Sequence, residues 1–100
     1  MLSHKQIEDA AILAHAFSSA TRIQICLELL QGEKCVEELA HSTEFTAPNC
    51  SQHLQVLKRL KLVRASRRGH SNFYNLENAA HIRSVLCALS QQSELSLSDN

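Results

Sequence analysis

Apolar side chains recur along the chain at the three- and four-residue spacing of helices, and this periodicity predicts the first elements of the fold. The first helix is expected over roughly residues 5 to 18, with a stripe of mostly small apolar side chains that would let another helix approach closely. A second helix begins near Ser19 to Thr21, where a hydroxyl can cap it, and ends at Gly32. A short third helical piece is expected over Val36 to Ala40.

The fourth predicted helix has a polar outer surface. Thr46 is placed to cap its first turn, and the helical pattern continues to about Leu60. Cys50, Leu54 and Leu57 recur on one face and predict an inward seam. The other faces of this helix carry polar or basic side chains with no acid among them: Asn49, Ser51, Gln52, His53, Gln55, Lys58 and Arg59.

Two short runs with the composition of strands follow, at Leu62 to Ser66 and Asn72 to Leu76, with residues 67–70 as the turn between them. A last helix is expected from about Asn78 to Gln91. The order predicts a mainly α fold with a small β-hairpin, a winged helix-turn-helix of the form α-α-α-α-β-β-α. One domain is expected over residues 1–92, and residues 93–100 are expected to form a polar tail.

Composition limits the classes of protein that this chain can represent. A chain of 100 residues, 44% hydrophobic and 20% charged, has room for one domain and excludes a multidomain enzyme. No motif brings a nucleophile and a base together, so we expect no enzymatic activity. No apolar run reaches a membrane span, and the first residues lack an apolar signal core. We therefore expect a cytoplasmic protein with no membrane partner.

Charge is strongly segregated although the formal net charge is zero. Residues 45–76 contain no acid but six cations, so this block carries +6, while the remaining four cations and ten acids give −6. Clustered Lys and Arg side chains neutralise phosphates and release condensed counterions, which favours a nucleic-acid partner. The six cations are Lys58, Arg59, Lys61, Arg64, Arg67 and Arg68.

Five stretches together resemble a known family. They read Cys35-Val36-Glu37-Glu38-Leu39-Ala40, Ser51-Gln52-His53-Leu54-Gln55-Val56-Leu57-Lys58, Leu62-Val63, Arg68-Gly69-His70 and Phe73-Tyr74-Asn75-Leu76. The chain is similar, over about residues 7 to 90, to the ArsR-type winged-helix repressors of bacteria, which respond to arsenic and metals. The resemblance implies a homodimer that binds a palindromic operator in double-stranded DNA and represses transcription until an inducer arrives. It also implies that the first and last helices pair across a twofold axis, for which the expected contacts are Ile7, Ala10, Ala14, Ile82, Val85, Leu86 and Leu89.

The residue types on the fourth helix suit DNA recognition. Side-chain amides can hydrogen-bond adenine, and imidazole can meet base edges, so Asn49, Gln52 and His53 are the expected major-groove contacts. The other expected DNA-binding residues lie near the helix start, along the helix or in the hairpin, where they would meet phosphates or flank the base contacts: Thr46, Ala47, Ser51, Gln55, Lys58, Arg67, Arg68 and His70.

The four cysteines are candidate effector residues, and no Cys-x-x-Cys pair is present. Cys26 and Cys50 lie in apolar patterns that indicate packing. Cys35 begins a helix beside Lys34, a setting that would lower the pKa of its thiol and raise its reactivity. Cys87 lies in the last helix. Repressors of this type that sense oxidants or sulfane sulfur pair cysteines from the second and last helices, which corresponds here to Cys26 and Cys87. Cys35 with Cys87 or with Cys50 is a further combination that the sequence leaves open.

The resemblance leaves the effector open. Arsenic-responsive members carry Cys-Val-Cys, but Glu37 stands here in place of the second cysteine. The zinc, cobalt or nickel site of other members would use His81, yet Ala79 occupies its partner position. We therefore expect no required cofactor and an effector that acts at thiols by oxidation, persulfide formation or binding of a soft metal or metalloid. The alternatives are a sensor of the zinc, cobalt or nickel type, or an interaction module without effector response.

Overall fold

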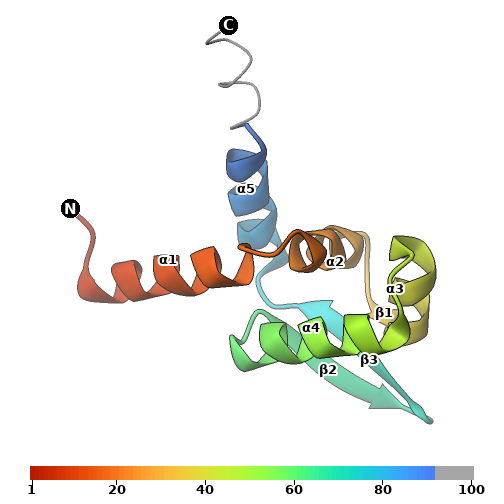
Figure 1. The fold of residues 1–100 in the computed structure, drawn as a ribbon. Coiled ribbons are helices and arrows are strands. Elements are labelled where there is room, and N and C mark those ends of the chain that lie inside the picture. The colour runs from red at the N-terminus through yellow and green to blue at the C-terminus, as the bar shows by residue number, and fades with distance from the viewer. Residues whose placement is uncertain (92–100) are drawn as a thin grey trace, which may run out of the picture.

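A computed structural model describes residues 1–91. Its elements, in chain order, are α1 (His4–Ala16), α2 (Ala20–Leu30), β1 (Lys34–Cys35), α3 (Val36–Thr43), α4 (Ala47–Arg59), β2 (Val63–Arg68), β3 (Ser71–Leu76) and α5 (Ala79–Ser90) (Figure 1). The predicted winged helix-turn-helix is thereby confirmed, with one strand added. The expected domain end at residue 92 and the expected tail at residues 93–100 lie outside the described residues.

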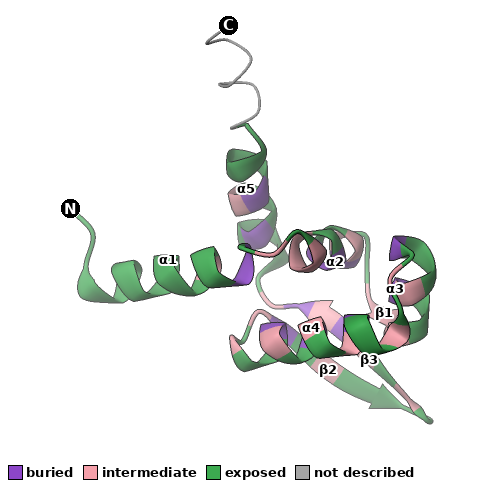
Figure 2. Cartoon of the chain, viewed as in Figure 1, coloured by how far each residue is buried: buried purple, intermediate pink, exposed green. Residues whose placement is uncertain are grey.

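The core lies where α2, α3 and α4 pack together over the sheet. The predicted seam of α4 is confirmed, because Cys50, Leu54 and Leu57 are all fully buried. They pack with buried side chains from the other elements, among them Ile25, Cys26, Leu29, Leu39, Val63, Tyr74, Leu76, Ile82 and Leu86. Figure 2 shows the contrast with α1, which is exposed along almost its whole length and is buried only at its carboxyl end.

The wing is a hairpin of β2 and β3 in a three-stranded antiparallel sheet of order β1-β3-β2. The register runs from Val63 opposite Leu76 to Arg68 opposite Ser71, so Arg67 and Arg68 belong to β2 and not to the turn predicted for them. Gly69 makes the turn at φ +59°, a conformation that costs glycine little because it has no Cβ.

Two other boundaries differ from the sequence prediction. The short strand β1 was not predicted, because its two residues carry no alternating pattern and pair with β3 through the backbone. Helix α3 continues to Thr43 instead of ending at Ala40. Its last turn is polar in sequence, yet Thr43 is buried and its hydroxyl donates to the Leu39 carbonyl at 2.6 Å.

Helices α1 and α5 project away from the rest of the molecule in different directions (Figure 1). At their junction they line an apolar groove of about 230 Å³, which Ala10, Leu13, Ala14, Phe17, Val85 and Leu89 form. Ile82 and Leu86, which we expected at a dimer interface, are instead buried in the core of the protomer. The apolar face of α5 is wide enough that one side packs inward while Leu89 stays 48% exposed.

Among residues 1–91, no single helix is long and apolar enough to cross a membrane. Only α1 and α2 taken together reach that length and hydropathy, and the chain bends by 100° between them.

Candidate nucleic-acid interface

A buried hydroxyl, that of Thr43, links α3 to the turn and to α4. Thr43 Oγ1 donates to the Leu39 carbonyl and accepts from the Phe45 N–H at 3.3 Å. The same oxygen lies 3.9 Å from Cys50 Sγ, in the buried seam of α4. The chain then turns at Glu44, whose φ of 65° lies in the left-handed region. These contacts join the two helices of the helix-turn-helix in one geometry.

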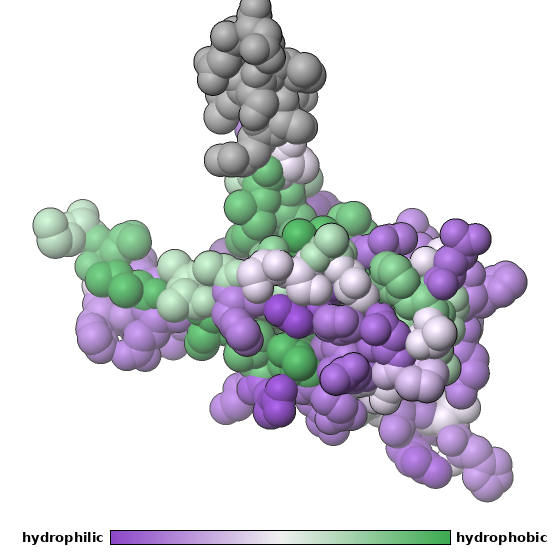
Figure 3. All heavy atoms as spheres, in the orientation of Figure 1, coloured by the Kyte–Doolittle hydropathy of each residue, from purple (hydrophilic) through white to green (hydrophobic). Residues whose placement is uncertain are grey.

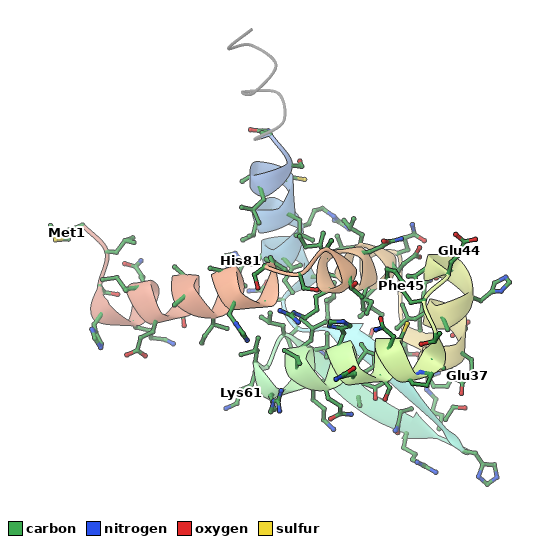
Figure 4. The ribbon with its side chains drawn as sticks, in the orientation of Figure 1. Met1, Glu37, Glu44, Phe45, Lys61 and His81 are labelled. Atoms are coloured by element: carbon green, nitrogen blue, oxygen red, sulfur yellow. The ribbon has the colours of Figure 1, made fainter. Side chains whose placement is uncertain are left out.

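Helix α4 begins at Thr46, whose hydroxyl accepts from the Asn49 N–H at 3.2 Å. With the seam buried, the opposite face presents Asn49, Gln52 and Gln55 to solvent, as predicted, while Ala47 and Ser51 are half-buried. In Figure 4 the Glu44–Phe45 turn lies at one end of α4 and Lys61 at the other. The amides therefore form a solvent-facing row between the turn and a basic end, and no acid lies on the helix.

His53 differs from the other predicted contacts because it is half-buried against α2. Its Nδ1 lies 3.3 Å from an Nη of Arg22, a residue in the first turn of α2 that sequence reasoning missed. Arg22 also donates to the carbonyls of Ala16 and His15 at the end of α1. Desolvation lowers the pKa of His53, and the Arg22 charge lowers it further. Nothing in the local sequence pattern indicates this contact, since it joins residues 31 positions apart.

Basic side chains gather where α4 ends and β2 begins. Lys58, Lys61 and Arg64 line a shallow, open hollow there of about 510 Å³. Arg64 pairs with Glu77 at 3.1 Å. Within residues 1–91, by contrast, no ion pair engages Lys58, Arg59, Lys61 or Arg67, so their charges stay available for phosphates.

Arg68 is held on the wing by an acid from outside the basic block. It forms an ion pair with Glu33, and its guanidinium lies 4.4 Å from the centroid of the Phe73 ring. Glu33 also accepts from the Asn75 amide at 2.7 Å. Sequence reasoning missed Glu33, because it precedes β1 and reaches the wing only through the fold. Arg67 and His70 are exposed on the wing without an ion pair in the described residues.

The cysteines fall into two groups. Cys26 and Cys50 are fully buried, as predicted, and burial raises the pKa of Cys26 to about 12. Cys35 is half-buried, and its predicted low pKa is wrong: desolvation raises the pKa of the thiol, and contacts with the Glu38 and Glu37 carboxylates raise it further. The backbone N–H at the helix terminus lowers the pKa of this thiol, but desolvation together with the two acids outweighs that effect. Cys87 is exposed on α5.

No disulfide joins the predicted pair Cys26 and Cys87. Cys87 lines an apolar groove of about 290 Å³ to which α2 contributes Ile23, Leu27 and Leu30, while Cys26 points into the core on another face of α2. All four cysteines are free thiols. In the part of the chain that the structure describes, no three His, Cys, Asp or Glu side chains gather as a metal site, and His81 stands exposed on α5.

Comparison with known proteins agrees with this geometry. Residues 19–65 match the model of the bacterial regulatory protein arsR family. The chain is 42% identical over 69 residues to the HTH-type transcriptional regulator KmtR of Mycobacterium tuberculosis, covering 69% of this chain and 52% of KmtR. It is 37% identical over 93 residues to the transcriptional repressor SmtB of the same species, covering 90% of this chain and 67% of SmtB. This chain thus spans about half the length of KmtR.

A solved structure agrees as well. The homodimeric winged helix-turn-helix domain of Mb0332 from Mycobacterium bovis superposes with a TM-score of 0.78 at 28% identity, covering 93% of this chain and 92% of that one. The helix-turn-helix, the basic wing and these similarities lead to one conclusion: the chain belongs to the ArsR family of bacterial regulatory proteins.

Proposed function

We propose that this protein is a homodimeric transcriptional repressor that binds a palindromic operator and leaves it when an effector acts at cysteine thiols. The observation that carries the proposal is the solvent-facing face of α4, where Asn49, Gln52 and Gln55 form a row of amides free of acids. Amide side chains at this spacing hydrogen-bond base edges in the major groove, where the second helix of a helix-turn-helix lies. A repressor must reach chromosomal DNA, so the proposal includes a cytoplasmic location.

The charge distribution supports the same docking. Lys58 and Lys61 lie at the carboxyl end of α4, and Arg67 lies on β2. None of them has a described acid partner, and all three would bind the phosphate backbone. Thr46, Ala47 and Ser51 stand at the amino end of α4, where the helix dipole favours a phosphate. Arg68 would support DNA binding by holding the wing in shape, because its charge is already paired with Glu33.

A homodimer is supported by the apolar surface that α1 and α5 leave uncovered. Figure 3 shows hydrophobic side chains gathered on these two helices, whereas the rest of the visible surface is largely hydrophilic. Ile7 is 53% exposed and Leu89 48% exposed, and the groove at the helix junction holds Ala10, Ala14 and Val85. A twofold axis through this surface would bury it and present two α4 helices to one duplex.

Exposure favours two of the four cysteines as the thiols on which an effector acts. Cys87 is exposed and Cys35 is half-buried, while the thiols of Cys26 and Cys50 are enclosed in the core. Peroxide, a polysulfide or a thiophilic ion reaches an accessible sulfur most readily. A zinc, cobalt or nickel sensor would require ligands from a second protomer, because no three-ligand group forms within the described part of one chain.

Selection of a bound duplex from a randomised DNA library tests the proposal. A palindromic consensus with half-sites one helical turn apart is expected, since each protomer presents one α4. Absence of any enriched sequence would contradict DNA reading and would favour an interaction module.

The selected duplex then serves to test the effector. The bound complex is exposed to peroxide, polysulfide, arsenite or zinc, and release is compared between the wild type and a variant with Cys35→Ser and Cys87→Ser. Release of the wild type alone is the expected result. A chain that still leaves the duplex after all four cysteines are replaced would contradict an effector at thiols.

A further inference from the structure

We infer that Arg22 is a positioning residue that fixes His53 as the neutral tautomer protonated on Nε2, so that this N–H donates to an acceptor atom of bound DNA. The inference deepens the proposed function and rests on it for the DNA contact alone. The juxtaposition that carries it is the 3.3 Å approach of an Arg22 Nη to His53 Nδ1, between the first turn of α2 and the exposed helix α4.

The chemistry of the two groups decides which nitrogen bears the proton. A guanidinium has only N–H donors and stays charged at any pH that a folded protein meets. Nδ1 of His53 can therefore join Arg22 only as an acceptor with a bare lone pair. In a neutral imidazole the other nitrogen then carries the proton, so Nε2 is the donor.

Arg22 is itself held in place, so it can define the orientation of the ring. Its Nε donates to the Ala16 carbonyl at 2.8 Å, and an Nη donates to the His15 carbonyl at 3.0 Å. Both carbonyls lie at the carboxyl end of α1, and the His15 carbonyl also accepts from the Ser18 N–H at 3.3 Å and from the Ser18 hydroxyl at 2.7 Å. A second contact, to Ser18 Oγ at 3.5 Å, steadies the same Nη. The guanidinium is thus fixed by the end of α1 before it meets His53.

The free side of the ring determines what His53 can recognise. No hydrogen bond within residues 1–91 engages Nε2, and His53 lies one residue after Gln52 on α4. Desolvation and the Arg22 charge lower the pKa of His53, which keeps the ring neutral at neutral pH. A neutral ring with its proton on Nε2 is a donor without charge. It suits a purine N7, a base carbonyl or a phosphate oxygen, and it cannot serve as an acceptor.

The tautomer is measurable in the free protein. Nitrogen-15 chemical shifts of the His53 ring at neutral pH distinguish a protonated ring nitrogen from a bare one. We expect a protonated Nε2 and a bare Nδ1, and a mixture of tautomers in an Arg22→Met variant. A wild-type ring that carries its proton on Nδ1, or on both nitrogens, would overturn the inference.

The DNA contact is tested by two substitutions that each keep half of the imidazole. His53→Asn places an oxygen near the position of Nδ1 and removes the outward donor, whereas His53→Gln keeps an amide donor near the position of Nε2. On the selected duplex, His53→Asn should lose roughly tenfold in affinity, the worth of one hydrogen bond, and His53→Gln should lose less. Equal affinities of both variants and the wild type would overturn the inference.

Modified duplexes identify the acceptor. Base analogues that lack one major-groove acceptor, and methylphosphonates that neutralise one phosphate, are scanned across a half-site. At one modified position the wild type should lose affinity while His53→Asn loses no further affinity. If that position is a base, the acceptor of the His53 N–H is a base atom. If it is in the backbone, the acceptor is a phosphate oxygen. If every modification reduced the affinity of His53→Asn as much as that of the wild type, the donor role of His53 would be contradicted. Failure to select any duplex would overturn the proposed function, whereas a wrong tautomer with normal selection would overturn this inference alone.

Discussion

At the scale of single residues, one hydroxyl links the two helices of the helix-turn-helix. Thr43 is 5% exposed, and its oxygen joins α3 to the turn by donating to Leu39 and accepting from Phe45. A buried polar group is tolerated when its hydrogen bonds are made, and Thr43 makes both. The turn therefore depends on Thr43, which is the last residue of α3.

Replacing Thr43 by Val tests this joint. The shape is nearly conserved, but the Phe45 N–H loses its acceptor, so the free energy of unfolding should fall by about 1 to 2 kcal/mol. Urea denaturation followed by circular dichroism measures the change. Ser42→Ala is the matched control, because Ser42 is exposed and makes a longer bond of 3.4 Å to the same Leu39 carbonyl. Equal effects of the two substitutions would contradict the role of Thr43.

Because the pKa of His53 is lowered, we expect this residue to make the folded protein less stable as the pH falls. Its pKa is lower in the folded chain than the ordinary value of 6.5, so the unfolded chain binds more protons between the two values. Stability from this residue is present above pH 6.5 and is lost as the pH falls through the window below it. The free energy of unfolding should depend less steeply on pH in His53→Gln than in the wild type. An identical slope in both would contradict the prediction.

Individual residues also mark where sequence reasoning reached its limit. Cys50, Leu54 and Leu57 were correctly predicted as an inward seam, because helical periodicity alone determines them. The pKa of Cys35 was predicted with the wrong direction, since two carboxylates and desolvation oppose the helix terminus. The contacts of Arg22 with His53 and of Glu33 with Arg68 join distant segments, and no local pattern indicates them.

At the scale of elements, the two neighbouring arginines of the wing, Arg67 and Arg68, have different surroundings. Arg68 is held by Glu33 and stacks on Phe73, which anchors β2 and β3 against the segment before β1. Arg67 is exposed and has no ion pair among residues 1–91. Adjacent residues of a strand point to opposite faces, so this division follows from the pleat.

Arg67→Ala should weaken binding to every duplex by a similar factor. The slope of log affinity against log salt should fall by about 0.9, the contribution of one phosphate contact. Fluorescence anisotropy over a salt series measures it. Lys5→Ala removes the same charge from the amino end of α1, far from the wing tip in Figure 1, and should leave the slope unchanged. Equal slopes for Arg67→Ala and the wild type would rule out the contact.

The order of helices and strands was predictable from the sequence, but the packing partners of each element were less so. Helical periodicity and strand composition predicted every helix and both wing strands to within a few residues. Strand β1 escaped because two residues cannot show a period. The apolar face of α5 was predicted as an interface, but Ile82 and Leu86 pack into the core, since a pattern does not tell which neighbour covers an apolar side chain.

At the scale of the whole molecule, the protomer separates an apolar side from a polar side. Helices α1 and α5 expose Ile7, Ile12 and Leu89, and the charged wing and α4 lie elsewhere on the molecule (Figure 3). A small domain buries too little surface to leave such a face in water without cost. The proposed dimer gives this face a partner and sets the spacing of the two α4 helices.

Leu89→Asp should shift the protein towards monomers. The change places a charge on the surface where α5 meets α1, and at least about a tenfold loss of dimer affinity is expected from the apolar contact alone. Sedimentation equilibrium measures the assembly state. Asn72→Asp adds the same charge at an exposed position of the wing and should leave that state unchanged. A Leu89→Asp variant that associates like the wild type would show that the dimer lies on another surface.

We propose that the solvent-facing amides of α4 contact base edges, and the Gln52→Ala variant is the sharpest test of this proposal. Affinity for the selected duplex and for single-base variants of it is measured at fixed salt, with Gln24→Ala on the exposed side of α2 as the matched control. We expect a loss of about 1 to 3 kcal/mol in binding free energy for Gln52→Ala, and a relaxed preference at one base pair of each half-site. Unchanged affinity and unchanged base preference would contradict it.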